Sequence, residues 1–365
     1  MTPRLAIGLM SGTSRDGVDA ALIETDGRDH VRPLAFLSLP YEAAVRDRLA
    51  QACSVALTMD GPASHEAIDV AAQEVTALHL DAVGRLLERN GTPAGEVGVI
   101  GFHGHTVAHR PDRGWSWQIG DAAGLARALG IMVVNDLRGA DIAAGGQGAP
   151  ILPVYHRAIA APLPKPAAIL NLGGVANITF IGEAEDELVA FDTGMASAMI
   201  DDWVRATAGL TFDEDGALAA AGRVDEAVLE QLLDHPYFRE PPPKSLERAA
   251  FSLAPLEGLS AEDGAATLTA FSARAVGLGV DRLPARPRRI HVAGGGRHNR
   301  TLMRTIAAAT GAELAPIDAL GWNGDAIEAQ GVAYMAVRSL AGLTITFPGT
   351  TGVDRAMAGG RVHRP

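Results

Sequence analysis

Short apolar runs that end at a glycine or a small polar residue recur along this chain and constrain its fold more than any other feature. Runs of this length bounded by turn formers are typical of buried β-strands. Helical patterns lie between them, and the clearest has Ser64 as its expected N-cap and Gly91 just past its end. Strands that alternate with helices predict an α/β fold. The expected strands are 5–10, 97–102, 131–136, 167–172, 188–192 and 289–293, and the other expected helices are 120–130, 299–311 and 325–342.

The composition narrows the class of protein. Of the 365 residues, 47% are hydrophobic and 20% are charged, which is typical of a chain that buries a sizeable core. The net charge of -12 argues against a nucleic-acid partner. No apolar run is long enough for a signal peptide or a membrane span, and the single cysteine, Cys53, excludes an intramolecular disulfide. We therefore expect a cytoplasmic protein with no membrane partner.

The first apolar run is followed by a glycine-rich turn and a second run, residues 18–24, as in an antiparallel hairpin. The chain has no G-x-x-x-x-G-K-[ST] motif, and a hairpin at this point is not how a Rossmann unit begins. Gly12 and Gly17 allow a close backbone approach, so successive N–H groups could bind an anion, with hydroxyls beside them. Asp16 and Asp19 could hold Mg²⁺ through water. An ordinary hairpin loop rich in turn formers remains the alternative.

Two later strands end in similar turns, at residues 171–179 and 292–299. One such turn is weak support for a ligand site, because glycines are also common in packing turns. Three of them, each at the carboxyl end of an expected strand, suggest a crevice that backbone donors line.

Several polar side chains are candidates for chemistry. Asp192 follows an apolar strand directly and could act as a general base, or it could cap the next helix. Arg138 lies between aspartates in a glycine-rich loop and suits recognition of a carboxylate or a sugar, unless the loop is merely solvated. Glu328 could line a cleft or complement a helix dipole. His103, His105 and His109 could bind zinc, although their spacing matches no standard zinc pattern.

The sequence resembles the anhydro-N-acetylmuramic acid kinases over nearly its whole length. The matching segments occur in the order of that family: "GLMSGTSRDGVDAALIE", "GFHGHTVAHRP", "QIGDAAGLARALGI", "VVNDLRGADIAAGGQGAPILP", "NLGGVANIT", "FDTG", "DGAATLTAF", "AGGGRHN" and "NGDAIEAQGVAYMAVR". The resemblance implies a two-lobed, actin-like ATPase fold of the ribonuclease H type, with ATP between the lobes. The lobes are expected at residues 1–131, with the C-terminal tail packed back on them, and 132–365.

The resemblance also implies the reaction and its residues. ATP, with Mg²⁺, would phosphorylate O6 of 1,6-anhydro-N-acetylmuramic acid as water opens the anhydro bridge, giving N-acetylmuramic acid 6-phosphate for cell-wall recycling, and the enzyme would be a homodimer. Asp192 matches the catalytic base of the family. We expect the nucleotide to contact Gly12, Thr13, Ser14, Arg15, Asp16, Gly17, Val18, Asp19, Asn171, Gly173, Gly174, Gly294, Gly295, Gly296 and Asn299. We expect the sugar to contact His103, His105, Arg138, Asp141, Gln147 and Glu328.

The chain departs from the pattern of the family on the sugar side. Met195, Ala196 and Ser197 replace the usual Pro-Gly-Asn after "FDTG", and His105 replaces a glutamine. Three other functions stay open at this point. The chain could be another amino-sugar kinase of the same fold, a non-catalytic actin-like regulator that binds nucleotide, or a zinc hydrolase.

Overall fold

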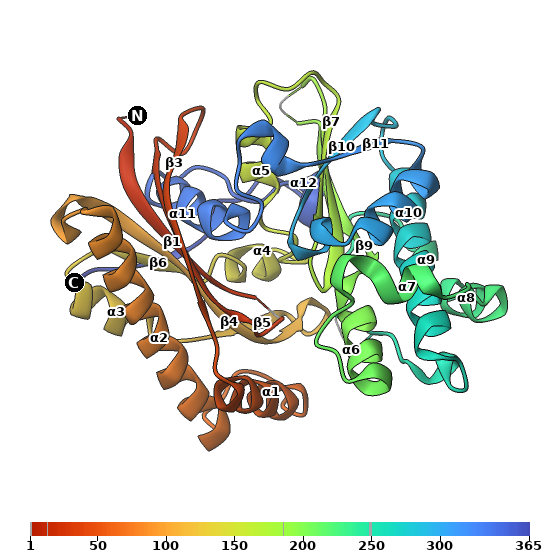
Figure 1. Ribbon diagram of the computed structural model, residues 1–365. Coiled ribbons are helices and arrows are strands. Elements are labelled where there is room, and N and C mark those ends of the chain that lie inside the picture. Colours follow the sequence, from red (N-terminus) through yellow and green to blue (C-terminus); the bar gives the residue numbers. More distant parts are fainter. Residues whose placement is uncertain (1, 13, 185, 248–249) are drawn as a thin grey trace. The chain divides into compact units, whose positions relative to one another are not determined.

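The computed structural model of this chain describes residues 2–12, 14–184, 186–247 and 250–365. Its internal contacts form two compact units, Met1–Pro162 with Ala326–Pro365, and Leu163–Asp325 (Figure 1). These bounds differ from the expected lobes 1–131 and 132–365. The first unit extends beyond residue 131 because β6 (Val133–Asn135) pairs in parallel with β4 (Val97–Arg110) of the same sheet.

The sheet of the first unit has the strand order β12-β6-β4-β1-β2-β3. Strands β1 to β3 form an antiparallel meander, which confirms the expected hairpin, and β4 runs parallel to β1. Strand β4 continues past the expected end at residue 102, and its second half pairs with β5. The three histidines of this segment therefore lie within a strand. The bounds of the other strands are β1 Arg4–Ser11, β2 Gly17–Thr25, β3 Val31–Pro40, β5 Trp115–Ile119 and β12 Arg361–His363.

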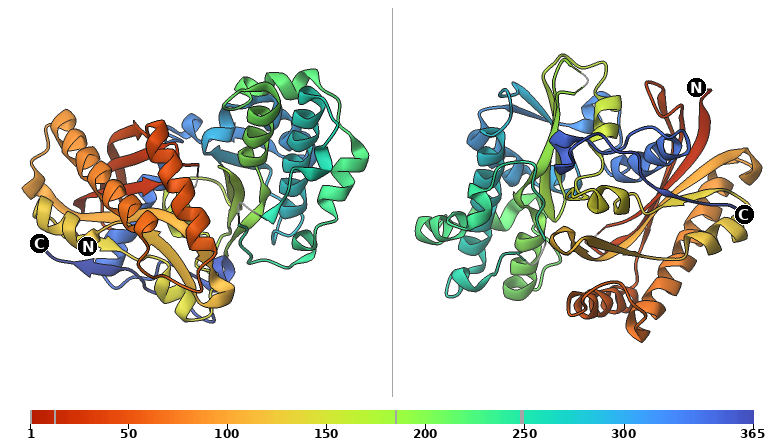
Figure 2. Two further views of the ribbon diagram at one scale, coloured as in Figure 1. Left: turned by 90° about the horizontal axis from the view of Figure 1, so that it is seen from below. Right: turned by 180° about the vertical axis from the view of Figure 1, so that it is seen from behind.

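Both faces of strand β1 are covered. Ile7 and Leu9 point into a core that they share with α2 (Glu66–Asn90). Gly8 points the other way, because successive side chains of a strand alternate between faces. A Cβ on Gly8 would lie 1.8 Å from the carbonyl oxygen of Ala329 in α11 (Ile327–Leu340), so the helix backbone lies directly on the sheet. In Figure 2 the orange helix α2 lies along the red strands of this unit.

Helix α2 ends as expected, with Gly91 in the left-handed conformation at φ 63°. It begins one residue later than expected. His65 is the N-cap, and its Nδ1 accepts a hydrogen bond from the N–H of Ala67. The hydroxyl of Ser64 instead donates to Asp69. An imidazole acceptor therefore does here what a serine hydroxyl usually does.

The sheet of the second unit has the strand order β11-β10-β7-β8-β9. Strands β7 to β9 form an antiparallel meander, and β10 runs parallel to β7 while β11 runs parallel to β10. Their bounds are β7 Ala167–Leu172, β8 Val175–Ile181, β9 Leu188–Met195, β10 Arg289–Ala293 and β11 Glu313–Pro316.

The two sheets share one topology. In each, a three-stranded antiparallel meander is followed by two strands that extend the sheet in parallel from the first strand of the meander. This strand order is that of the ribonuclease H-like fold. A chain that contains it twice has the architecture of an actin-like ATPase. The expected fold class is therefore confirmed, and it comes from a duplication of topology that the sequence does not show as a repeat.

Helices pack on both sheets. In the second unit, α6 and α8 to α10 lie beside the sheet as green to blue ribbons (Figure 2), and α9 and α10 bury apolar side chains against it. The helices of the first unit are α1 Ala43–Leu57, α3 Ala122–Leu129, α4 Gly139–Ala143, α5 Pro153–Ile159 and α12 Pro348–Thr351, with α2 and α11 as above. Those of the second unit are α6 Ser197–Ala208, α7 Ala217–Ala221, α8 Glu226–Leu233, α9 Ala261–Val280 and α10 Arg300–Thr310.

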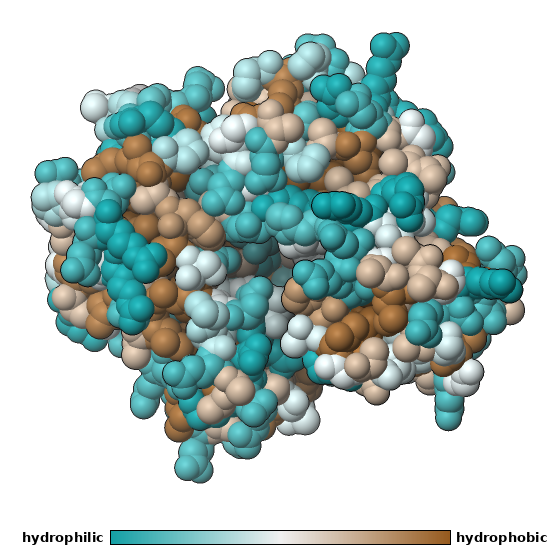
Figure 3. All heavy atoms as spheres, viewed as in Figure 1, coloured by the Kyte–Doolittle hydropathy of each residue, from teal (hydrophilic) through white to brown (hydrophobic). Residues whose placement is uncertain are grey.

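The outer surface is mixed in character. Figure 3 shows small hydrophobic areas interspersed among hydrophilic residues over the face it draws. Among the residues that the structure describes, no helix is both long enough and apolar enough to cross a bilayer.

Candidate active site

The turn between β1 and β2 in the first unit has an irregular backbone. Arg15 adopts φ 58°, and its N–H donates to the carbonyl of Gly12 at 3.1 Å, so the turn closes on itself. Ser14 and Asp16 are exposed, whereas Gly17 is buried against β3, where a Cβ would lie 2.3 Å from the carbonyl oxygen of Leu39. Thr13, a predicted nucleotide contact, lies outside the described residues.

Two predicted residues next to this turn face inward. The side chain of Val18 belongs to the hydrophobic core under the sheet. His105 is fully buried, and its Nδ1 lies 2.9 Å from the Oγ of Ser11, the last residue of β1. Burial lowers the pKa of His105 to about 4, with a smaller contribution from the charge of Arg15, so the imidazole is neutral at pH 7.

His103 and Arg138 lie side by side at the end of the sheet. Arg138 Nη2 is 3.0 Å from His103 Nε2, and His103 Nδ1 is 3.0 Å from the carbonyl oxygen of Gly104. A guanidinium only donates, so Nε2 accepts and the Nδ1–H donates to Gly104. Burial and the charge of Arg138 lower the pKa of His103 to about 3, which keeps it in this neutral form.

The loop that carries Gln147 is held from both sides. Arg138 donates to the carbonyl of Gly148 at 2.7 Å, and Asp141 accepts from the N–H of Gly148 at 2.7 Å. The second oxygen of Asp141 accepts from Thr351 at 2.6 Å, and Asp141 is 1% exposed. Asp141 therefore shapes this loop through its own hydrogen bonds, while Gln147 and Glu328 are half-buried.

The three histidines of β4 do not converge on one point. His103 contacts Arg138, His105 contacts Ser11, and His109 Nδ1 lies 2.9 Å from the hydroxyl of Ser116. Within the part of the chain that the structure describes, no group of three or more His, Cys, Asp or Glu side chains could hold a metal ion. The geometry therefore gives no support to the zinc-hydrolase alternative.

In the second unit, two of the predicted glycine turns lie against each other. A Cβ on Gly294 would lie 2.5 Å from Asn171 Oδ1, and one on Gly296 would lie 2.7 Å from the Cβ of Leu172. The carbonyl oxygens of Gly173 and Gly174 accept hydrogen bonds from the first N–H groups of α6. The structure therefore brings the turns after β7 and β10 together, as expected from parallel strands, and the absence of side chains makes the approach possible.

The turn after β10 is held by a buried arginine. Arg297 donates to the carbonyl of Gly294 at 3.0 Å, to Asp318 at 2.8 Å and to both oxygens of Asp325 at 2.6 and 3.0 Å. Its side chain is 3% exposed. Asn299, a predicted nucleotide contact, is the N-cap of α10, and its Oδ1 accepts from the N–H of Leu302 at 2.8 Å.

Asp192 lies in the middle of β9 and is 8% exposed. Its Oδ2 accepts a hydrogen bond of 2.7 Å from the N–H of Leu246, and its own N–H donates to the carbonyl of Lys244 at 3.0 Å. Asp192 does not cap α6, because carbonyls of the Gly173–Gly174 turn accept the first N–H groups of that helix. The alternative structural role considered for Asp192 is therefore wrong, and its carboxylate is held by the segment around residues 244–246.

Comparison with known proteins decides the family. The sequence profile described as "Anhydro-N-acetylmuramic acid kinase" matches residues 4–364. A protein of that name from Rhizorhabdus wittichii is 61% identical over 365 residues, covering 100% of both chains. One from Zymomonas mobilis is 51% identical, covering 98% of this chain and 99% of its own. The chain belongs to the anhydro-N-acetylmuramic acid kinase family. A solved structure of (R)-2-hydroxyglutaryl-CoA dehydratase component A from Acidaminococcus fermentans is 11% identical, with a TM-score of 0.49 over 93% of this chain and 99% of its own.

For this member of the anhydro-N-acetylmuramic acid kinase family, sequence reasoning missed the residues that hold Asp192. The hydroxyl of Tyr237 donates to the carbonyl of Asp192, and Lys244 Nζ donates to the carbonyl of Tyr237 at 2.6 Å. The ammonium also lies 4.0 Å from the centre of the Tyr237 ring. Burial lowers the pKa of Lys244 to about 8. The only signal in the sequence is a lysine after three prolines, which predicts a turn and not this contact.

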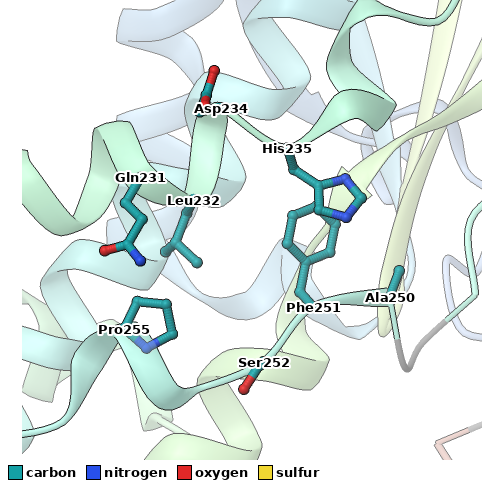
Figure 4. A pocket seen from close by; sticks show the side chains of 8 residues that line it. All are labelled: Gln231, Leu232, Asp234, His235, Ala250, Phe251, Ser252 and Pro255. Atoms are coloured by element: carbon teal, nitrogen blue, oxygen red, sulfur yellow. The ribbon is translucent and has the colours of Figure 1, made fainter.

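A pocket of about 340 Å³ lies elsewhere in the second unit of this kinase-family chain (Figure 4). The rings of His235 and Phe251 are 4.5 Å apart at its edge. None of the predicted site residues lines it. Its lining residues are Gln231, Leu232, Asp234, His235, Ala250, Phe251, Ser252 and Pro255.

Proposed function

We propose that this chain is an ATP-dependent kinase that opens the bridge of 1,6-anhydro-N-acetylmuramic acid with water and phosphorylates O6. The single observation that carries this proposal is membership of the anhydro-N-acetylmuramic acid kinase family over residues 4–364. Curated relatives of that name are 46–61% identical over at least 97% of this chain. The product would be N-acetylmuramic acid 6-phosphate, in the recycling of cell-wall peptidoglycan.

The reaction requires two bond changes at one sugar. The anhydro sugar has no free 6-hydroxyl, because O6 is bonded to the anomeric carbon. Water attacks the anomeric carbon, the bond from that carbon to O6 breaks, and O6 forms a bond to the γ-phosphorus of ATP while ADP leaves. One proton of the water must move to a base as the new carbon–oxygen bond forms.

Asp192 is the proposed base. Its carboxylate is held by the N–H of Leu246, which fixes the direction of one oxygen. It is 8% exposed, so few water molecules reach it. A positioned carboxylate that removes a proton in the transition state contributes about 10²–10⁴-fold to the rate.

We assign the phosphates of ATP to the turn around residues 12–16 and to the turn at Gly173 and Gly174, and the adenosine to the turn at Gly294 to Gly296. Backbone N–H groups in such turns bind anions. On the sugar side, Arg138 and His103 are the proposed contacts, since a guanidinium suits the lactyl carboxylate.

Asp16 and Asp19 are the proposed residues for Mg²⁺, which such sites bind through one or two carboxylates, water and phosphate oxygens. Burial is the main cause that raises the pKa of Tyr41 to about 12, and the charges of Asp16 and Asp19 add to it. Asp16 is exposed in the turn, and Asp19 is half-buried in β2. When bound, the ion would offset the negative charge of the phosphates. We further propose that the enzyme is a cytoplasmic homodimer, which light scattering of the purified protein can test for its oligomeric state.

Mass spectrometry of the product tests the function. The protein is incubated with ATP and the anhydro sugar in ¹⁸O-labelled water, and the product is analysed within minutes. We expect a phosphorylated N-acetylmuramic acid with the label on the anomeric oxygen and none on the phosphate. Label in the phosphate would exclude the mechanism. Turnover of N-acetylmuramic acid or N-acetylglucosamine instead would indicate another sugar kinase, and ATP binding without turnover of any of the three would indicate a regulator.

A further inference from the structure

One residue holds both ends of the turn between β1 and β2. Tyr41 follows the last residue of β3, and its N–H donates to the carbonyl of Asp16 at 2.8 Å, where the turn ends. Its hydroxyl lies 2.7 Å from the Oγ of Ser11, where the turn begins. The turn from residue 12 to residue 16 is therefore held at both ends by the backbone and the side chain of a single residue.

The contact continues into the interior of the first unit. The Oγ of Ser11 also lies 2.9 Å from Nδ1 of His105, and Ser11 and His105 are 1% and 0% exposed. Tyr41 is 5% exposed. A buried hydrogen-bond chain of this kind has few alternative arrangements, because breaking it would leave a buried polar group without a partner.

The hydrogen-bonded groups of Tyr41, Ser11 and His105 are all neutral at pH 7. Burial raises the pKa of Tyr41 to about 12 and lowers that of His105 to about 4, so neither is charged at pH 7. A protonated tyrosine can donate to Ser11, and Ser11 can donate to Nδ1 of a neutral imidazole, whose Nε2–H then faces the Sγ of Cys53 at 3.9 Å. Tyr41 therefore acts on the turn by fixing its position and not through a charge.

We propose that Tyr41, through Ser11 and with His105 behind it, is a positioning residue that fixes the turn at residues 12–16 for the phosphates of the nucleotide. The inference rests on the proposed function, which assigns phosphates to this turn. Ordering the turn before the nucleotide arrives lowers the cost of binding, because fewer backbone dihedrals are lost on binding. The residue touches no reacting atom, so its removal acts on nucleotide affinity.

Tyr41→Phe separates this role from packing. The ring of Tyr41 belongs to the hydrophobic core under the sheet, and phenylalanine keeps that ring and removes only the hydroxyl. Tyr155→Phe is the matched control, because Tyr155 is a buried tyrosine of the same unit whose hydroxyl donates to Gln330 at 2.8 Å. Both variants lose one buried hydrogen bond, and only the first loses one at the turn.

The measurements are the Kd of ADP by calorimetry, the KM values of ATP and of the anhydro sugar, and the midpoint of thermal unfolding. We expect Tyr41→Phe to raise the Kd of ADP and the KM of ATP about 3- to 10-fold, the range of one hydrogen bond, with the KM of the sugar unchanged. Tyr155→Phe should leave the Kd of ADP unchanged while lowering the unfolding midpoint. Equal ADP affinity in Tyr41→Phe and wild type would overturn the proposal, whatever the two unfolding midpoints are.

A double-mutant cycle adds a second route to the same contact. Ser11→Ala removes the partner of the Tyr41 hydroxyl, so adding Tyr41→Phe to it should change the Kd of ADP by less than twofold more. Additive effects would overturn the coupling through Ser11. The ADP titration needs no sugar turnover, so it separates the two proposals. A wild type that binds ADP and phosphorylates no anhydro sugar would remove the proposed function alone, and a wild type that binds no adenine nucleotide would remove both.

Discussion

The N–H of Leu246 donates to Oδ2 of Asp192 at 2.7 Å, across 54 residues of sequence. The same segment accepts from the backbone of Asp192 through the carbonyl of Lys244. Backbone groups of this segment therefore bind both the side chain and the main chain of Asp192. A base that is already held in one orientation pays a smaller entropy cost when it is aligned with the substrate for reaction.

Asp192→Asn should nearly abolish turnover while leaving the fold intact. Asparagine keeps an oxygen that can accept from Leu246 but cannot take a proton, so we expect kcat to fall about 10²- to 10⁴-fold. Steady-state kinetics and the thermal unfolding midpoint check this together. Asp281→Asn is the control, since Asp281 is an exposed aspartate of the same unit that pairs with Arg286. Full activity of Asp192→Asn would exclude the assignment.

Arg297→Met should weaken ATP binding and destabilise the second unit. The change removes the donor to the carbonyl of Gly294 and leaves Asp318 and Asp325 without their shared cation. Since both carboxylates are about half exposed, we expect a loss of about 1–3 kcal/mol in the free energy of unfolding and a raised KM for ATP.

Arg289→Met is the matched control for Arg297→Met. Its ion pair with Glu313 is exposed, so the expected change in the free energy of unfolding is within about 0.5 kcal/mol. Chemical denaturation and kinetics measure both variants. Equal stability and equal KM for ATP in the two variants would contradict a role for Arg297 in holding the turn.

The first unit should lose stability as the pH falls below about 6.5. Burial is the main cause of five lowered histidine pKa values in this unit, to about 4 or about 3, so the unfolded chain binds these protons before the folded one does. The contribution of these neutral histidines to the free energy of unfolding is therefore fully present above pH 6.5. It falls as the pH drops toward 4, by up to about 1.4 kcal/mol per pH unit for each histidine. The histidines are His79, His103, His105, His109 and His156.

Hydrogen exchange followed by mass spectrometry at pH 7.5 and pH 5, corrected for the intrinsic exchange rate, resolves this effect by unit. We expect protection to fall first in residues 1–162 and 326–365, which form the first unit. His79→Leu should reduce the slope of stability against pH in the acid range and change it little at pH 7.5, which lies above the window. Earlier loss of protection in residues 163–325 would contradict the prediction.

Gly8→Ala should destabilise the first unit strongly. The added Cβ would lie 1.8 Å from the carbonyl oxygen of Ala329, so the sheet and α11 would have to separate. Overpacking of this kind costs about 1–3 kcal/mol or more. Gly84→Ala is the control, because Gly84 lies within α2 with open space around it, and alanine there should be neutral or stabilising by up to about 1 kcal/mol. Denaturant titrations of both variants give the comparison, and equal stability would contradict the close contact.

Much of the local structure follows from sequence patterns. Alternating apolar residues on both sides of a glycine-rich turn predicted the β1–β2 hairpin, and Gly91 predicted the end of α2, because these signals act between residues close in the chain. The bounds of the two units did not follow. A three-residue strand, β6, carries too weak a pattern to show which sheet it joins.

The roles of single site residues depended on contacts between distant parts of the chain. His103 and His105 look alike in sequence, yet one contacts Arg138 and the other Ser11, which is 94 residues away. Asn299 and Asp141 carry the residue types of a ligand site, but their oxygens already accept hydrogen bonds within their own unit.

By itself, the sequence determined the α/β class, the glycine turns at the ends of strands and, through ordered motifs, the family. The tertiary structure decided that the strands form two sheets of one topology, which residues hold Asp192, and that Tyr41 meets both ends of the first turn. The physical reason is range. Propensity and periodicity act over a few residues, whereas a hydrogen bond between Ser11 and His105 exists only after the strands between them have paired.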